Sequence, residues 1–223
     1  MKMKAKIIFL ALLPAIMFAQ SGLDELVNPK DLIPDIAIDL RYSTPNHSFL
    51  NIPNKGNILL PKFYTCNETL VLLKLANALK LAQDYLRTVT LHNNKEYPKG
   101  IGIKIWDGYR PRAIQYLFFE IYPNPTYIAD PASGSMHNRG GAIDVTLIDL
   151  STGEELEMPT LFDDFSEAAS LSYTNLTQEV INNRDLLKYA MSTVAHLNTY
   201  SAEWWHYNLS DASSYPLQDF QMK

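Results

Sequence analysis

The chain has 223 residues, and its 19 lysines and arginines against 24 aspartates and glutamates leave a formal charge of −5 with neutral histidines. This acidic balance argues against a nucleic-acid-binding protein, and a hydrophobic content of 47% is typical of a globular protein rather than a disordered or fibrous one. With no repeat or linker in the sequence, we predict a single domain at residues 20–223.

The N-terminus predicts an export signal. Lys2, Lys4 and Lys6 precede an uncharged apolar run at residues 7–19. This run is shorter than the roughly 20 residues of a membrane span, and it ends beside small residues that suit a cleavage site. We therefore expect residues 1–19 to be a signal peptide and the protein to be exported, in a bacterium to the periplasm. An uncleaved membrane anchor is the alternative.

The first third of the chain predicts loops followed by a long helix. Residues 23–66 are rich in proline and other turn formers, and they include one short alternating stretch at 36–40 that favours a strand. Apolar residues then recur at helical spacing over residues 67–86. Asn67 stands where the N-cap of this helix is expected.

The rest of the chain mixes strands and helices. Alternating isoleucines predict a strand at 101–107, and a helix over 112–122 follows, with Pro111 at its first position. Residues 140–147 alternate and read as a strand, residues 187–194 carry a helical pattern, and the aromatic segment 203–209 favours a strand. We predict an α+β fold with a mainly antiparallel central sheet and flanking helices.

Two segments concentrate residues that can hold a metal ion. His137 and Asp144 lie seven positions apart around Gly140 and Gly141, so a bend from loop to strand can direct both side chains at one ion. Neutral imidazole and carboxylate are suitable ligands for a tetrahedral Zn²⁺ that keeps one position for water. A third protein ligand is then required, and His206 is a candidate. The sequence thus predicts a zinc site on the sheet.

Glu203 could serve as the base of such a site, because a metal-bound water needs a nearby carboxylate to take its proton. In a regular strand, however, residues three apart point to opposite faces, so Glu203 and His206 converge only if the chain bends at Glu203. We predict such a bend before the strand.

Other polar residues have structural interpretations. The segment 107–111 has two equally good interpretations. It is either a turn, in which Asp107 is a cap and Arg110 pairs with a surface acid, or a functional motif. His47, His92 and His196 have no carboxylate partner at a telling spacing, and we interpret them as packed or loop histidines.

Three segments together resemble one known family, the zinc D-alanyl-D-alanine dipeptidases of the VanX type. They read Asp-Gly-Tyr-Arg-Pro at 107–111, Ser-x-His-x-Arg-Gly-x-Ala-Ile-Asp-x-Thr-Leu at 135–147 and Glu-Trp-Trp-His at 203–206. The resemblance runs from about residue 39 to the C-terminal region. It implies a D-Ala-D-Ala dipeptidase domain at 20–223.

The resemblance also implies a role for each matching residue. One Zn²⁺ per chain would be bound by His137, Asp144 and His206, with Glu203 as the general base and Arg110 facing the transition state. The implied reaction is hydrolysis of the amide bond of D-Ala-D-Ala, in cell-wall turnover or salvage.

Two further residues match positions of the family that hold the substrate. They are Ser135 and Asp163, and the acid would face the free ammonium group of the dipeptide. A D,D-carboxypeptidase acting on peptidoglycan stem peptides stays open as an alternative, although Asp163 favours the dipeptidase. An alternative of another class is a non-catalytic zinc-containing module that binds the cell wall. No nucleic acid, membrane or obligate protein partner is expected.

Overall fold

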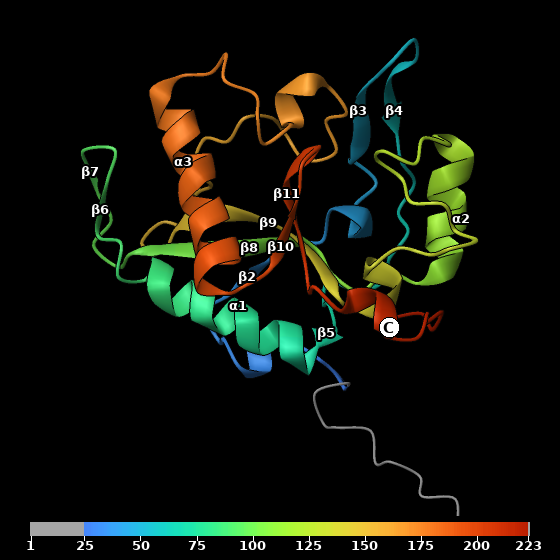
Figure 1. The fold of residues 1–223 in the computed structure, drawn as a ribbon, viewed down its shortest axis with the longest axis horizontal. Helices are drawn as coiled ribbons and strands as arrows, with labels where there is room; N and C mark the ends of the chain where they lie inside the picture. The colour runs from blue at the N-terminus through green and yellow to red at the C-terminus, as the bar shows by residue number, and fades with distance from the viewer. Residues whose placement is uncertain (1–24, 223) are drawn as a thin grey trace, which may run out of the picture.

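The computed structural model describes residues 25–222, so the predicted signal peptide at 1–19 lies outside the described residues. In residues 25–222 three α-helices surround a five-stranded sheet with the strand order β10-β11-β9-β8-β2 (Figure 1). This is the predicted α+β class. None of the helices in this part of the chain is long and apolar enough to cross a membrane.

The central sheet is mixed. Its strands are β2 (Ala37–Ile38), β8 (Ile101–Asp107), β9 (Ala142–Asp149), β10 (Asn198–Tyr200) and β11 (Glu203–Asn208). Strands β8, β9, β11 and β10 pair antiparallel in that order, whereas β2 pairs parallel with β8. The prediction of a mainly antiparallel sheet is therefore corrected. After β2 the chain passes through the first helix before it returns as β8, and such a crossover lets neighbouring strands run in the same direction.

The described part of the chain contains three α-helices. They are α1 (Leu73–Leu86), α2 (Arg112–Ile121) and α3 (Gln178–Lys188), which continues as a π-helical segment (Tyr189–Val194). Figure 1 shows α1 lying across one face of the sheet. The Gln83 side-chain oxygen of α1 accepts a hydrogen bond from the backbone N–H of Ile103 at 2.8 Å.

The alternation of side chains along β8 and β9 determines which of them share a face of the sheet. Ile103 and Ile105 of β8 lie opposite Leu147 and Val145 of β9, and all four are fully buried. Because successive side chains alternate between the two faces of a strand, Asp144 points to the opposite face from Val145 and Leu147. The candidate ligand strand thus presents its carboxylate to the opposite face of the sheet.

The start of α1 differs from the prediction. The helix begins at Leu73 because Val71 and Leu72 form a short strand, β5 (Val71–Leu72), which pairs antiparallel with β1 (Leu26–Val27). Asn67 is not the N-cap. Its side-chain oxygen instead accepts the backbone N–H of Leu40 at 3.1 Å, which ties the segment after β2 to the chain before α1.

The proline-rich N-terminal region also contains a hairpin that the sequence did not reveal, β3 (Ser48–Ile52) with β4 (Gly56–Leu59). The ring of Phe49 packs against Phe118 of α2 and against Phe165. The backbone N–H of Leu50 donates to the Asp163 carbonyl at 2.8 Å, so the hairpin is joined to the loop that follows residue 160. A second small hairpin, β6 (Leu91–His92) with β7 (Lys95–Glu96), lies at the far end of α1.

Candidate metal centre

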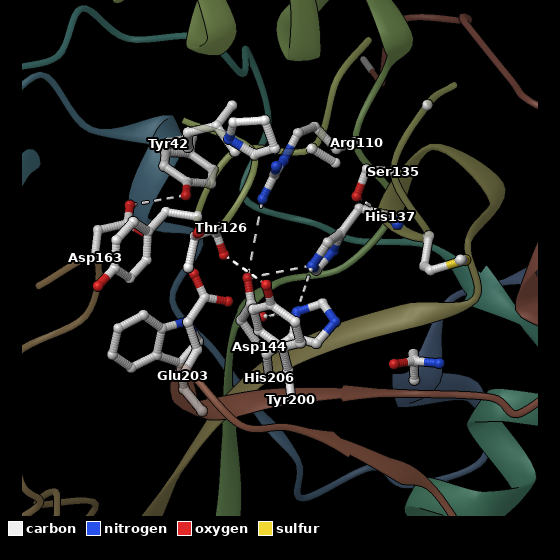
Figure 2. Close-up of a pocket in the computed structure, with 18 residues that line it drawn as sticks. Tyr42, Arg110, Thr126, Ser135, His137, Asp144, Asp163, Tyr200, Glu203 and His206 are labelled. Atoms are coloured by element: carbon white, nitrogen blue, oxygen red, sulfur yellow. Dashed lines mark hydrogen bonds and ion pairs between the residues drawn. The ribbon is translucent and has the colours of Figure 1, made fainter. Parts of the chain in front are cut away.

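A pocket of about 310 Å³ opens beside strands β9 and β11 (Figure 2). Its walls come from the segment before α2, the loop around residues 125–137, strands β9 and β11, and the loop that follows residue 160. All seven site residues expected from the sequence line it. They are Arg110, Ser135, His137, Asp144, Asp163, Glu203 and His206.

Three of these side chains converge on one point. His206 Nδ1 lies 3.0 Å from Asp144 Oδ1, His137 Nε2 lies 3.4 Å from Asp144 Oδ2, and the two ring nitrogens are 3.2 Å apart. In a tetrahedral zinc site with bonds of about 2.0–2.2 Å, ligand atoms are separated by about 3.3–3.6 Å. The distance between the ring nitrogens lies close to this range, and the two distances to Asp144 run to its two different oxygens. With one ligand atom from each residue, the three atoms lie within 4.8 Å of one another, so the donor set fits a tetrahedral metal ion after a rotation of the Asp144 carboxylate.

A backbone carbonyl fixes the orientation of the His137 ring. Its Nδ1 lies 2.7 Å from the carbonyl oxygen of Gly108, so the ring N–H donates there and the Nε2 lone pair faces the other two ligands. Gly108 itself is tightly enclosed, since a Cβ at this position would lie 2.3 Å from Thr69 Oγ1. The glycine thus lets the backbone reach the imidazole that it orients.

The charges of the cluster suit a metal ion. Burial alone raises the pKa of Asp144, but the nearby His137 and His206 outweigh it and hold this pKa well below its usual range. Burial lowers the pKa of His206, which favours the neutral imidazole that binds metals. Burial lowers the pKa of His137, but the charge of Asp144 outweighs burial and raises it, so a metal ion at this site would take the place of a proton on that imidazole.

Glu203 lies in the same pocket as the first residue of β11. A turn at residues 201–202 comes directly before it, and the register of β10 and β11 shifts next to Tyr200. The prediction placed Glu203 at a bend before the strand, whereas Glu203 is the first residue of β11. The shift in register lets Glu203 and His206 line one pocket although they are three residues apart. Burial, together with the charges of Asp144 and Asp163, raises the pKa of Glu203 well above its ordinary value. A carboxylate of this kind accepts protons readily.

Arg110 is buried and held in place. Its Nε and Nη2 donate to Asp107 Oδ2 at 2.9 and 2.8 Å, and its Nη1 donates to Gln115 Oε1 at 2.9 Å. The interpretation in which Arg110 pairs with a surface acid is wrong, because Asp107 is fully buried and also accepts the Tyr64 hydroxyl at 2.8 Å. Arg110 Nη2 lies 3.9 Å from Asp144 Oδ2, so its positive charge stands beside the three candidate ligands.

Ser135 is tied to the same framework. Its Oγ accepts the backbone N–H of His137 at 3.2 Å, and its own N–H donates to Asn138 Oδ1 at 2.8 Å. Asn138 Nδ2 in turn donates to the carbonyl oxygen of Arg110 at 2.7 Å. One buried amide therefore holds the segment that carries the serine against the segment that carries the arginine.

Sequence reasoning missed two partners of Asp163. Asp163 Oδ2 accepts the Tyr42 hydroxyl at 2.8 Å, and His47 Nε2 lies 2.7 Å from the same oxygen (Figure 2 shows the Tyr42 contact). His47 is packed and hydrogen-bonded, as interpreted, but the sequence did not predict that its partner is a carboxylate. With 116 positions between His47 and Asp163, no spacing pattern could have indicated the pair. His92 contacts Asn183 instead, at 2.9 Å.

Comparisons with known proteins identify the family of the chain. A family model described as D-ala-D-ala dipeptidase, of peptidase family M15, matches residues 23–223. A protein named D-alanyl-D-alanine dipeptidase from Escherichia coli (strain K12) is 32% identical over 197 residues, which cover 88% of this chain and 91% of that protein. Proteins of the same name from Enterococcus faecium and Streptomyces coelicolor are 30% and 26% identical. Those two alignments cover 86% and 81% of this chain, and 96% and 89% of the relatives.

Proposed function

The chain belongs to the D-Ala-D-Ala dipeptidases of peptidase family M15, and we propose that it splits D-Ala-D-Ala into two D-alanines with one Zn²⁺ held by His137, Asp144 and His206. The observation that supports this most directly is the convergence of three ligand atoms, within 4.8 Å of one another, in a pocket that also contains Glu203 and Arg110. Two imidazoles and one carboxylate are a common donor set for catalytic zinc.

The residues of the pocket have different roles in the proposed reaction. A zinc ion in this site would polarise the scissile carbonyl and lower the pKa of a water molecule to about 7. Glu203 takes the proton of the attacking water and passes it to the leaving amine. Arg110 donates hydrogen bonds to the oxygen that gains negative charge. Asp107 and Gln115 already fix its guanidinium, so it needs little rearrangement during the reaction.

The residues at the rim of the pocket favour a substrate as small as a dipeptide. The hydroxyl of Tyr200 donates to the carbonyl oxygen of Thr126 at 2.7 Å, and both residues line the pocket. This bond ties the loop around residues 125–137 to strand β10 at the pocket. Ser135 and Asp163 hold the substrate, and Asp163 pairs with its free ammonium group. A peptide extended at the amino end would place uncharged backbone against this acid.

The setting of the reaction follows from the N-terminal sequence. We propose that residues 1–19 direct export and are removed, so that the enzyme acts in the periplasm on dipeptide from cell-wall turnover or salvage. After cleavage it needs no membrane attachment and no obligate protein partner.

The purified chain without residues 1–19 is expected to release D-alanine from D-Ala-D-Ala. A chelator should abolish this release and added zinc should restore it, because the ligand cluster holds the metal ion that activates the water. N-acetyl-D-Ala-D-Ala should not be cleaved, since it carries no ammonium group for Asp163. Preference for the acetylated substrate would point to a carboxypeptidase, and a folded, zinc-loaded protein that cleaves neither would contradict an enzymatic role.

Asp144→Ala is expected to weaken zinc binding by more than about 100-fold, which is the upper end of the loss seen for partners outside the ligand set. The reason is the removal of an ionised carboxylate that lies between two imidazoles. Competition with a zinc-binding dye measures the affinity. Asp185→Ala, which changes an exposed carboxylate on α3, serves as the matched control. Full zinc affinity in Asp144→Ala would exclude Asp144 as a ligand.

A further inference from the structure

The two oxygens of the Asp163 carboxylate have different surroundings. Oδ2 is in contact with Tyr42 and His47, at 2.8 and 2.7 Å. Oδ1 makes no hydrogen bond with any side chain or backbone group of residues 25–222, although the residue is buried and lines the catalytic pocket. One oxygen is therefore already occupied by the protein, and the other remains available to a ligand in the pocket.

His47 is held in place by packing on several sides. Its imidazole stacks on Phe162 with ring centroids 5.3 Å apart and meets the edge of Tyr42 at 5.4 Å. Its carbonyl oxygen accepts the backbone N–H of Leu60 at 2.9 Å, which anchors it to the end of hairpin β3–β4. A histidine fixed in this way can hold a carboxylate at a set angle.

The backbone of Asp163 also requires support. Its φ of +58° lies in the left-handed region, which few residues other than glycine adopt unless the surrounding structure holds them there. The N–H of Leu50 donates to the Asp163 carbonyl, and the N–H of Phe165 donates to the Leu50 carbonyl at 3.0 Å. The hairpin that carries His47 thus positions both the backbone and the side chain of Asp163.

We propose that His47 is a positioning residue of the ammonium subsite: together with Tyr42 it occupies Asp163 Oδ2 and so directs Oδ1 toward the amino end of the dipeptide. This inference rests on the proposed function. An ionised carboxylate only accepts hydrogen bonds, so His47 donates from Nε2–H. Without this donor only the Tyr42 hydroxyl would hold Oδ2, and the Asp163 carboxylate would be less tightly fixed against the substrate.

The experiment compares His47→Leu with His47→Gln in the zinc-loaded enzyme acting on D-Ala-D-Ala. Leucine removes the donor, and we expect KM to rise about tenfold, the lower end of the range for a hydrogen bond to a charged group, while kcat changes less than about threefold. Glutamine keeps an N–H donor at similar reach and should restore KM to within about threefold of the wild type. His92→Leu, a histidine outside the pocket, is the matched control and should leave KM unchanged.

A double-mutant cycle separates positioning from a purely structural role. In an Asp163→Asn background, His47→Leu should raise KM no further, because its effect acts through the carboxylate. Additive effects, or a His47→Gln variant as impaired as His47→Leu, would overturn the proposal. If His47→Leu does not fold, His47→Asn, whose shorter amide falls short of Asp163, replaces it. A wild-type enzyme that releases no D-alanine would overturn the proposed function as well, whereas an active wild type and an unchanged KM in the leucine variant would overturn only the role of His47.

Discussion

Glu203→Gln is expected to lower kcat on D-Ala-D-Ala by about 10²–10⁴-fold, the usual contribution of a positioned general base, while the protein keeps its zinc. The amide has the size of the carboxylate but cannot take a proton from the attacking water. Glu203 also lies outside the cluster of three ligand atoms, so the metal site should stay intact. Steady-state kinetics and zinc analysis of the same preparation measure both quantities. Glu120→Gln, on the exposed side of α2, is the control.

The stability of this variant provides an independent check. Burial and the charges of Asp144 and Asp163 raise the pKa of Glu203, so the ionised side chain is unfavourable in the folded metal-free protein. A neutral amide removes that cost, and the melting temperature of the metal-free variant should equal or exceed that of the wild type. An unchanged kcat would place the base elsewhere. Loss of zinc would instead mean that Glu203 is itself a ligand.

The parts of the site that could be predicted depend on local spacing. His137 and Asp144 are joined by one short bend, so the order of residues nearly determines where these side chains point. Glu203 and His206 lie close in sequence, and because residues three apart in a regular strand point to opposite faces, their convergence required an irregularity there. The buried isoleucines of β8 likewise predict their strand, because the alternation of apolar residues can be recognised within a short segment. In each case the residues that determine the local geometry lie close together in the sequence.

The parts that could not be predicted depend on contacts between distant segments. The parallel pairing of β2 with β8 joins residues 37–38 to residues 104–105, and nothing in either segment specifies the partner or its direction. The start of α1 was misplaced for the same reason, since β5 forms only because β1 pairs with it. The contact of His47 with Asp163 likewise requires the hairpin β3–β4 to be in position first.

Arg110 should affect both catalysis and stability, and two substitutions can separate the effects. Arg110→Lys keeps the positive charge beside Asp107 but cannot reproduce the planar set of donors that also reaches Gln115 and the pocket. We expect kcat to fall about 10²–10³-fold, the loss typical of one donor to a developing oxyanion. Arg184→Lys, at a second buried arginine that lies outside the pocket, is the matched control for kcat.

Arg110→Ala should lose as much activity and should also unfold more easily. Asp107 is fully buried, and its two hydrogen bonds from Arg110 would be lost with the charge that balances it. Breaking a buried ion pair by removing one partner costs about 3–5 kcal/mol, which urea unfolding can measure. Asp107→Asn combined with Arg110→Ala should recover part of this stability, because no unpaired charge remains, but it should recover none of the activity. Recovery of activity in the double variant would show that Arg110 acts only by neutralising Asp107 and not on the oxyanion.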